Sequence, residues 1–259
     1  MPEFQNVPRV ARADAPLWGQ LTGLQPQQEV VLEVRFQDEL KRTWKGQTRY
    51  QASAQGSIDL AAAHPVGAAW TGSDAYGPYW SMTLQDKTDF PWSFEAVTAE
   101  LQPLQTQLTA LSSSDVIAEA NFERQFVFNA TQEIWRDDLT ANLFLPVGAE
   151  VSAGVLVLGG SEGGFTWANQ VAALVAASGR AALALAYFDW QGRYGLPTSL
   201  TEIPVEYFER ALERLQNHPR VIANTAIVSF SKGTEAAFLL ASQRNDISDV
   251  VAYAPSTYV

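Results

Sequence analysis

The sequence contains no cysteine and only two histidines, His64 and His218, among its 259 residues. The absence of cysteine excludes disulfide bonds and thiolate metal sites, and two histidines are too few for a histidine-rich metal site. We therefore expect no cofactor. Basic residues are also scarce, because 17 Lys and Arg stand against 28 Asp and Glu, for a net charge of −11. This balance argues against nucleic acid and anionic membranes as partners.

Long apolar runs are missing as well. No run approaches the length of about 18 residues that a membrane-spanning helix needs. The first residues, MPEFQNVPRVARADAP, lack the apolar segment of a signal peptide. These absences predict a soluble cytoplasmic protein.

The chain does contain enough apolar residues, 47%, for one large or two smaller cores. Residues 29–36 alternate between apolar and polar side chains, with Val31, Val34 and Phe36 on or near one face, which is typical of a half-buried strand. Further short strands are expected at 43–52, 56–60 and 80–84. Short strands joined by turns predict an antiparallel β-sandwich over residues 1–115, ending in a linker at Ser112–Asp115.

The pattern changes in residues 116–259. Residues 121–129 alternate and are expected to pair, as an edge hairpin, with residues 138–146. Continuous apolar runs then alternate with helical patterns, which predicts a doubly wound parallel sheet. The expected strands are 154–158, 181–187, 221–228 and 249–254, and the expected helices are 167–178, 204–217 and 234–243.

Residues 225–236, TAIVSFSKGTEA, combine a buried strand, a turn at Ser231 and a helix that opens at Lys232–Gly233. This is the layout of a nucleophile elbow, in which a strained turn holds a serine above a parallel sheet. The usual G-x-S-x-G pattern has Ser229 in place of its first glycine. The simpler alternative is that Ser231 only caps the helix.

The sequence GGSEGG, residues 159–164, follows the first continuous apolar strand. Beside a nucleophile elbow, such a loop supplies one backbone donor to an oxyanion, and the residue after the nucleophile supplies another. The expected donors are the N–H groups of Ser161 or Glu162 and of Lys232. A phosphate-binding loop or a plain tight turn remains the alternative for this segment.

A general base for Ser231 is harder to find. No histidine follows Ser231, and His218 lies just ahead of the strand that leads to the serine, so we expect it at the opposite end of the sheet. His64 belongs to the predicted sandwich. Residues 187–194, YFDWQGRY, lie at the carboxyl edge of a strand, where Arg193 would meet a phosphate unless the loop only packs over the sheet.

Taken together, these stretches resemble the acyl-CoA thioesterase and bile acid-CoA:amino acid N-acyltransferase family. The resemblance covers nearly the whole chain. In the first half it includes LTGLQPQQEVVLEV, WKGQTRY, GSIDL and GSDAYGPYWSM; in the second half it includes LFLP, GGSEGG, LPTSLTEIPVEYFERALERLQNHPRV, SKGTEAAFLLAS and APSTYV.

The resemblance implies an N-terminal β-sandwich followed by an α/β-hydrolase domain with Ser231 as nucleophile, where acyltransferase members use cysteine. It implies an acyl-CoA or related acyl thioester as substrate. The catalytic acid and histidine of the family lie beyond Val259, so we expect an incomplete hydrolase domain, weak or absent activity, and a partner chain or further segment that completes the sheet. Another esterase or peptidase, or a non-enzymatic binding fragment, is the alternative.

Overall fold

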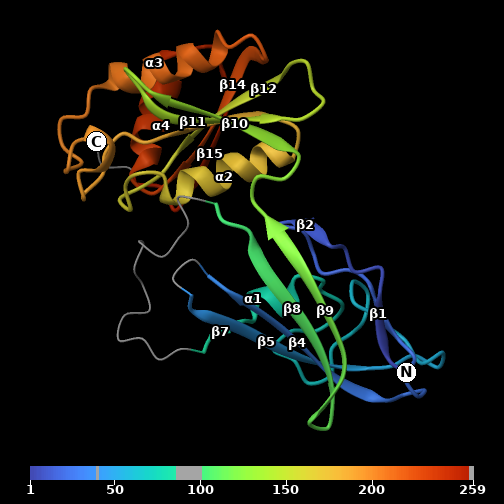
Figure 1. The fold of residues 1–259 in the computed structure, drawn as a ribbon. Helices are drawn as coiled ribbons and strands as arrows, with labels where there is room; N and C mark the ends of the chain where they lie inside the picture. Colours follow the sequence, from blue (N-terminus) through green and yellow to red (C-terminus); the bar gives the residue numbers. More distant parts are fainter. Residues whose placement is uncertain (39–40, 86–100, 257–259) are drawn as a thin grey trace. The chain divides into compact units, whose positions relative to one another are not determined.

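The computed structural model describes residues 1–38, 41–85 and 101–256 (Figure 1). Contacts divide the chain into two compact units, of which one ends at Gln125 and the other runs on from Phe126. Each unit has its own hydrophobic clusters. No helix in these described ranges is long and apolar enough to cross a membrane.

Two sheets share one hydrophobic cluster in the first unit. Among the described residues, the larger sheet has strand order β2-β9-β8-β4-β5-β7 and the smaller has order β1-β3-β6. The cluster takes Leu32 from the larger sheet and Leu21 from the smaller. The strands are β1 Glu3–Gln5, β2 Val10–Arg12, β3 Gln20–Thr22, β4 Glu29–Gln37, β5 Thr43–Gln51, β6 Ile58–Asp59, β7 Thr83–Leu84, β8 Leu104–Ser112 and β9 Asp115–Gln125.

Two local predictions for this unit need correction. The buried face of β4 consists of Val30, Leu32 and Val34, and by the alternation of the strand Phe36 shares this face, whereas Val31 points the other way. The segment predicted as a strand over 80–84 begins instead as the end of a short helix, α1 (Gly77–Trp80), and only β7 is extended. Pro78 lies in the first turn of α1, a position that proline tolerates in a helix.

The predicted linker Ser112–Asp115 is the turn of a β-hairpin. Ser112 and Asp115 are cross-strand partners at the ends of β8 and β9, and Ser113 has a φ of +59°. Residues 86–100, ahead of β8, lie outside the described residues. The hairpin carries the chain on to Gln125 within the first unit, well past the boundary that the sequence predicts between 115 and 116.

The second unit is built on a sheet with strand order β10-β11-β13-β12-β14-β15. The pairs β12–β13, β12–β14 and β14–β15 are parallel, and β10 and β11 are antiparallel to their neighbours. The mainly parallel sheet confirms the predicted α/β class. Its strands are β10 Ala130–Arg136, β11 Thr140–Pro146, β12 Ser152–Leu158, β13 Ala181–Leu185, β14 Val221–Phe230 and β15 Ile247–Tyr253.

The strand that pairs with β11 in a hairpin is β10, which starts at Ala130. The prediction that residues 121–129 fill this role is therefore wrong, because residues 121–125 belong to β9 and pair with β8. Both segments alternate in the same way, and alternation fixes the face of a strand without fixing its partner.

Helices cover both faces of the second sheet (Figure 1). The helix α2 (Thr166–Ala177) packs through Ala168, Ala172 and Ala176 against one face, where Val155 and Val157 of β12 point. The helices α3 (Val205–Gln216) and α4 (Gly233–Gln243) pack against the other face, which carries Leu156 and Leu158. Burial on both faces explains why β12 is apolar from Ala153 to Leu158 rather than alternating.

Candidate active site

Ser231 occupies the turn between β14 and α4. The strand ends at Phe230, and the helix begins at Gly233. The φ of Ser231 is +48°, in the left-handed region that residues with a Cβ atom seldom adopt. A backbone strained in this way persists only where the surrounding structure holds it.

Hydrogen bonds to the backbone of Ser231 hold this turn. Its N–H donates to the carbonyl of Tyr253 at 2.9 Å, and its own carbonyl accepts from the hydroxyl of Thr234 at 2.6 Å. The Ser231 hydroxyl makes no hydrogen bond to the residues that the structure describes. The helix α4 begins without a side-chain cap. Ser231 therefore does not cap the helix, and its hydroxyl is available.

Ser229, which stands where a glycine is usual, is fully buried. Its hydroxyl donates to the carbonyl of Val251 on the neighbouring strand β15 at 3.4 Å. A small side chain fits between the two strands and finds a partner for its one polar atom. The substitution is thus compatible with the tight turn that follows.

The loop of residues 159–164 lies directly against the Ser231 turn. A Cβ atom on Gly160 would lie 2.8 Å from the Cβ atom of Ser231, and a Cβ atom on Gly233 would lie 2.2 Å from the carbonyl oxygen of Gly159. Both distances are too short for any side chain, so glycine is required at these contacts. The hydroxyl of Tyr187 donates to the same Gly159 carbonyl at 2.7 Å and fixes the loop from its other side.

The three predicted backbone donors differ in their surroundings. Neither the N–H of Lys232 nor that of Ser161 donates a hydrogen bond within the described part of the chain. The N–H of Glu162 bonds to the carboxyl group of its own side chain. Two of the three donors are therefore open to a ligand, and the third has a partner.

The Glu162 side chain is buried, with 5% of its surface exposed. One carboxyl oxygen, Oε1, accepts from the N–H of Gly160 at 2.8 Å, and the other, Oε2, has no partner among the described residues. Burial raises the pKa of this carboxyl group, while the hydrogen bonds from the Gly160 and Glu162 N–H groups partly oppose that rise.

Neither histidine lies near Ser231 within the second unit's sheet. His218 precedes the first residue of β14 and Ser231 follows its last, so the strand separates them by about 30 Å. His218 accepts a hydrogen bond from the Arg220 N–H at 3.2 Å, and its other ring nitrogen lies 3.5 Å from Glu133. His64 lies in the first unit.

Arg193 in the aromatic loop has a protein partner. Its guanidinium group donates to the buried carboxylate of Asp189 at 3.0 Å and 2.8 Å. Asp189 also accepts from the N–H of Gln191 at 2.9 Å. This network orders the loop, and it favours the packing role of these residues over the phosphate-binding alternative.

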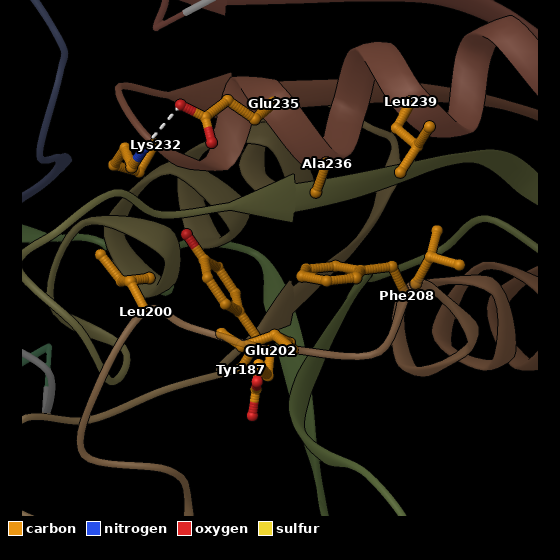
Figure 2. Close-up of a pocket in the computed structure, with 10 residues that line it drawn as sticks. Tyr187, Leu200, Glu202, Phe208, Lys232, Glu235, Ala236 and Leu239 are labelled. Atoms are coloured by element: carbon orange, nitrogen blue, oxygen red, sulfur yellow. Dashed lines mark hydrogen bonds and ion pairs between the residues drawn. The ribbon is translucent and has the colours of Figure 1, made fainter. Parts of the chain in front are cut away.

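An apolar cavity of about 310 Å³ opens beside the Ser231 turn, between α3 and α4 (Figure 2). Tyr187, Phe208 and Ala236 line it, and Lys232 lies at its edge in an ion pair of 2.7 Å with Glu235. The sequence did not predict this cavity. The pattern of α3 shows that Phe208 points inward, but the space beside it depends on how α3 and α4 pack.

Among the described residues, no three or more His, Cys, Asp or Glu side chains lie close enough together to hold a metal ion.

Two family models match the chain. The N-terminal region of the acyl-CoA thioester hydrolase/BAAT family matches residues 14–136, and the C-terminal part of the same family matches residues 203–259. Ser231 and Lys232 lie within the second match, and residues 159–164 lie between the two.

Similar proteins carry related names. Acyl-coenzyme A thioesterase 6 of Mus musculus is 31% identical over 90% of this chain and 55% of its own length. The peroxisomal succinyl-coenzyme A thioesterase of Mus musculus is 29% identical over 95% of this chain and 58% of its own length. The chain thus spans a little over half the length of these relatives. A solved structure of a putative dienelactone hydrolase from Klebsiella pneumoniae is 16% identical, with a TM-score of 0.43 over 50% of this chain and 61% of its own.

A mainly parallel sheet, helices on both faces and a serine in a left-handed turn after an inner parallel strand place the second unit in the α/β-hydrolase fold class. The two family matches add the particular family. The chain belongs to the acyl-CoA thioester hydrolase/BAAT family.

Proposed function

We propose that this protein hydrolyses acyl-CoA thioesters and uses Ser231 as its nucleophile. The observation that carries the proposal is the Ser231 turn: a hydroxyl without a hydrogen bond to the described residues, in a left-handed turn, against a glycine loop with open N–H groups. A strand, a left-handed turn at the serine and a helix in this order support its interpretation as a nucleophile elbow. Membership of a thioester hydrolase family supports the choice of substrate.

In the proposed reaction, the Ser231 oxygen attacks the thioester carbonyl and forms a tetrahedral oxyanion. The N–H groups of Lys232 and Ser161 stabilise this charge, each contributing about 3 kcal/mol. The α4 N-terminus adds its partial positive charge. Loss of the CoA thiolate, whose parent thiol has a pKa of about 8.5, leaves an acyl-serine. Water then releases the acid and restores Ser231.

We further propose that turnover by these 259 residues is slow. A serine nucleophile ordinarily depends on a histidine base, and His218 lies at the opposite end of β14 from Ser231. Acylation is then easier to observe than repeated turnover.

The outer edge of the sheet supports one more part of the proposal. β15 is the last strand of the sheet order, and its residues Val251 and Tyr253 are 45% and 55% exposed. An open, apolar edge strand tends to pair with another strand. We propose that a further strand, from this polypeptide or a partner, adds to β15.

Intact-mass spectrometry after mixing the protein with acetyl-CoA and hexanoyl-CoA tests the central proposal. We expect one acyl group to be added per chain, and peptide mapping to place it on Ser231. Oxyesters and peptides with the same acyl group should react more slowly. An adduct only from oxyesters or peptides would instead indicate an esterase or peptidase. An adduct on another residue would contradict Ser231 as the nucleophile. The absence of an adduct from every substrate would also contradict it and would indicate a binding fragment.

The cavity beside Lys232 suggests where the acyl chain lies. It is mostly apolar, and Lys232 at its edge is the residue after Ser231. Its volume of about 310 Å³ is at the lower end of the range for small-molecule pockets. We therefore propose that the acyl chain enters between α3 and α4.

Filling this cavity should change the chain-length preference. We expect Ala236→Phe to lower acylation by hexanoyl-CoA about tenfold or more relative to acetyl-CoA, because each buried methylene contributes about 0.8 kcal/mol. The ratio of the two single-turnover rates is the measurement, and it corrects for any general loss of activity. Phe238→Trp adds bulk to the exposed side of the same helix and serves as control, since Phe238 is 40% exposed. An unchanged ratio in Ala236→Phe would place the acyl chain elsewhere.

A further inference from the structure

The side chain of Glu162 lies beside the nucleophile and has no part in the reaction steps proposed above. It comes from the loop after β12, while Ser231 follows β14, and the two strands are neighbours in the sheet. A carboxyl group buried to 5% exposure is costly unless the surrounding structure satisfies it.

Only one half of this carboxyl group is satisfied. Oε1 accepts the Gly160 N–H at 2.8 Å, which anchors the side chain, whereas Oε2 has no hydrogen-bond partner in the described part of the chain. Most buried polar atoms in proteins are hydrogen-bonded, and a group that is not can be one that the chemistry of an active site requires.

The unpaired oxygen and the Ser231 turn both lie beside Gly160. A Cβ atom placed on Gly160 would lie 3.0 Å from Oε2 of Glu162 and 2.8 Å from the Cβ atom of Ser231. Because Gly160 has no side chain, nothing at its Cβ position separates the Glu162 carboxyl group from the Ser231 side chain. The Ser231 hydroxyl has no described hydrogen-bond partner either, so the structure brings a free donor and a free acceptor to opposite sides of the same glycine.

The other ionisable groups around this pair already have partners. The hydroxyl of Tyr187 donates to the Gly159 carbonyl, and burial raises the pKa of Tyr187, so it stays neutral. Lys232 pairs with Glu235, and Arg193 pairs with Asp189 across Gly164. Burial also raises the pKa of Glu162, which makes its carboxylate a stronger base than an exposed one.

We propose that the Glu162 carboxylate accepts the proton of Ser231 during acylation, an inference that rests on the proposed role of Ser231 as nucleophile. As the Ser231 oxygen bonds to the acyl carbon, its O–H bond breaks and the proton moves to Oε2 of Glu162. The carbonyl π electrons move to oxygen, and they return as the C–S bond breaks and the thiolate leaves. The thiolate takes up this proton from Glu162, which returns the carboxyl group to its ionised form. In deacylation, Glu162 accepts a proton from the attacking water and passes it to the serine oxygen as the acid leaves.

The variant Glu162→Gln tests this role. Glutamine keeps the shape and the acceptor for the Gly160 N–H, and it removes the basic oxygen. The readout is the rate at which a fluorophosphonate probe labels Ser231 from pH 4 to 9, which depends on activation of the serine and not on thioester recognition. Glu206→Gln on the exposed side of α3 is the matched control, and thermal unfolding confirms that each variant is folded.

In the wild-type protein, labelling should rise as pH increases through the raised pKa of Glu162, because only the ionised carboxylate accepts a proton, and should then level off. In Glu162→Gln, labelling at pH 7 should fall about a hundredfold or more, and this rise should disappear. Glu162→Asp, with a shorter reach, should restore part of the rate.

Equal labelling by Glu162→Gln with the same pH profile would overturn the inference, as would faster labelling, which would mean that the carboxyl group obstructs the donors. The acyl-CoA adduct is scored separately on the same variants. Labelling that depends on Glu162 without any acyl-CoA adduct supports the inference and rejects the thioesterase proposal. An acyl-CoA adduct whose formation does not depend on Glu162 supports the thioesterase proposal and rejects the inference about Glu162. No labelling of the wild-type Ser231 at any pH rejects both.

Discussion

Replacing Ser231 by alanine should abolish the acyl adduct and lower any acyl-CoA turnover by at least about a thousandfold. The reason is that the Ser231 hydroxyl, which has no hydrogen bond to the described residues, is the nucleophile in the proposed reaction. What remains should be the small rate that the Lys232 and Ser161 donors give to attack by water. Intact-mass spectrometry for the adduct and thiol release for turnover are the measurements.

Ser229→Ala is a matched control for this prediction. Ser229 lies two positions earlier, on β14, and its buried hydroxyl donates to the carbonyl of Val251 at 3.4 Å. Its removal should leave the adduct in place. Ser231→Cys should also form an adduct, since a thiolate is a strong nucleophile. A Ser231→Ala protein that still forms the same adduct would place the nucleophile on another residue.

The sequence predicted the second unit well because its elements are defined by local patterns. The apolar run of β12, the helical period of α3 and the strand–turn–helix around Ser231 all appear at nearly the predicted positions. Each of these elements is buried on both faces of a sheet or on one face of a helix. The spacing of apolar residues in the sequence indicates such burial directly.

The errors concern pairing over long distances. Ser112–Asp115 contains small and polar residues that suit a linker and a hairpin turn equally, and only the pairing of β8 with β9 decides between them. The assignment of residues 121–129 to the second sheet failed for the same reason.

The candidate site was predictable in its backbone and not in its side chains. The position of Ser231 follows from the end of an apolar strand and the start of a helix. The unpaired oxygen of Glu162 depends on the fold of a glycine loop, in which Gly163 and Gly164 have φ values of +72° and +56°. No pattern in GGSEGG indicates that the carboxyl group turns back toward the Gly160 N–H. The cavity beside Lys232 likewise depends on packing between segments distant in sequence.

Gly233→Ala should be the most damaging single change to the stability of the second unit. A Cβ atom at this position would lie 2.2 Å from the carbonyl oxygen of Gly159 and 3.0 Å from that of Leu158. Both atoms belong to the backbone, so no side-chain rotation relieves the clash, and α4 must move away from the loop. We expect the free energy of unfolding to fall by about 3 kcal/mol, and labelling of Ser231 to fall with it.

The direction of the stability change in Gly233→Ala distinguishes the effect of the backbone clash from the effect of helix propensity. Gly233 begins α4, and replacing glycine by alanine within a helix normally stabilises it by about 1 kcal/mol. Hydrogen exchange of the β14 amides measures the stability of the second unit itself. Gly148→Ala is the control, because its Cβ atom would meet nothing within 4 Å and only its φ of +84° opposes the change. A Gly233→Ala protein that is as stable as the wild type would mean that α4 does not rest on the Gly159 carbonyl, and the close approach that brings Ser231 to the glycine loop would then be wrong.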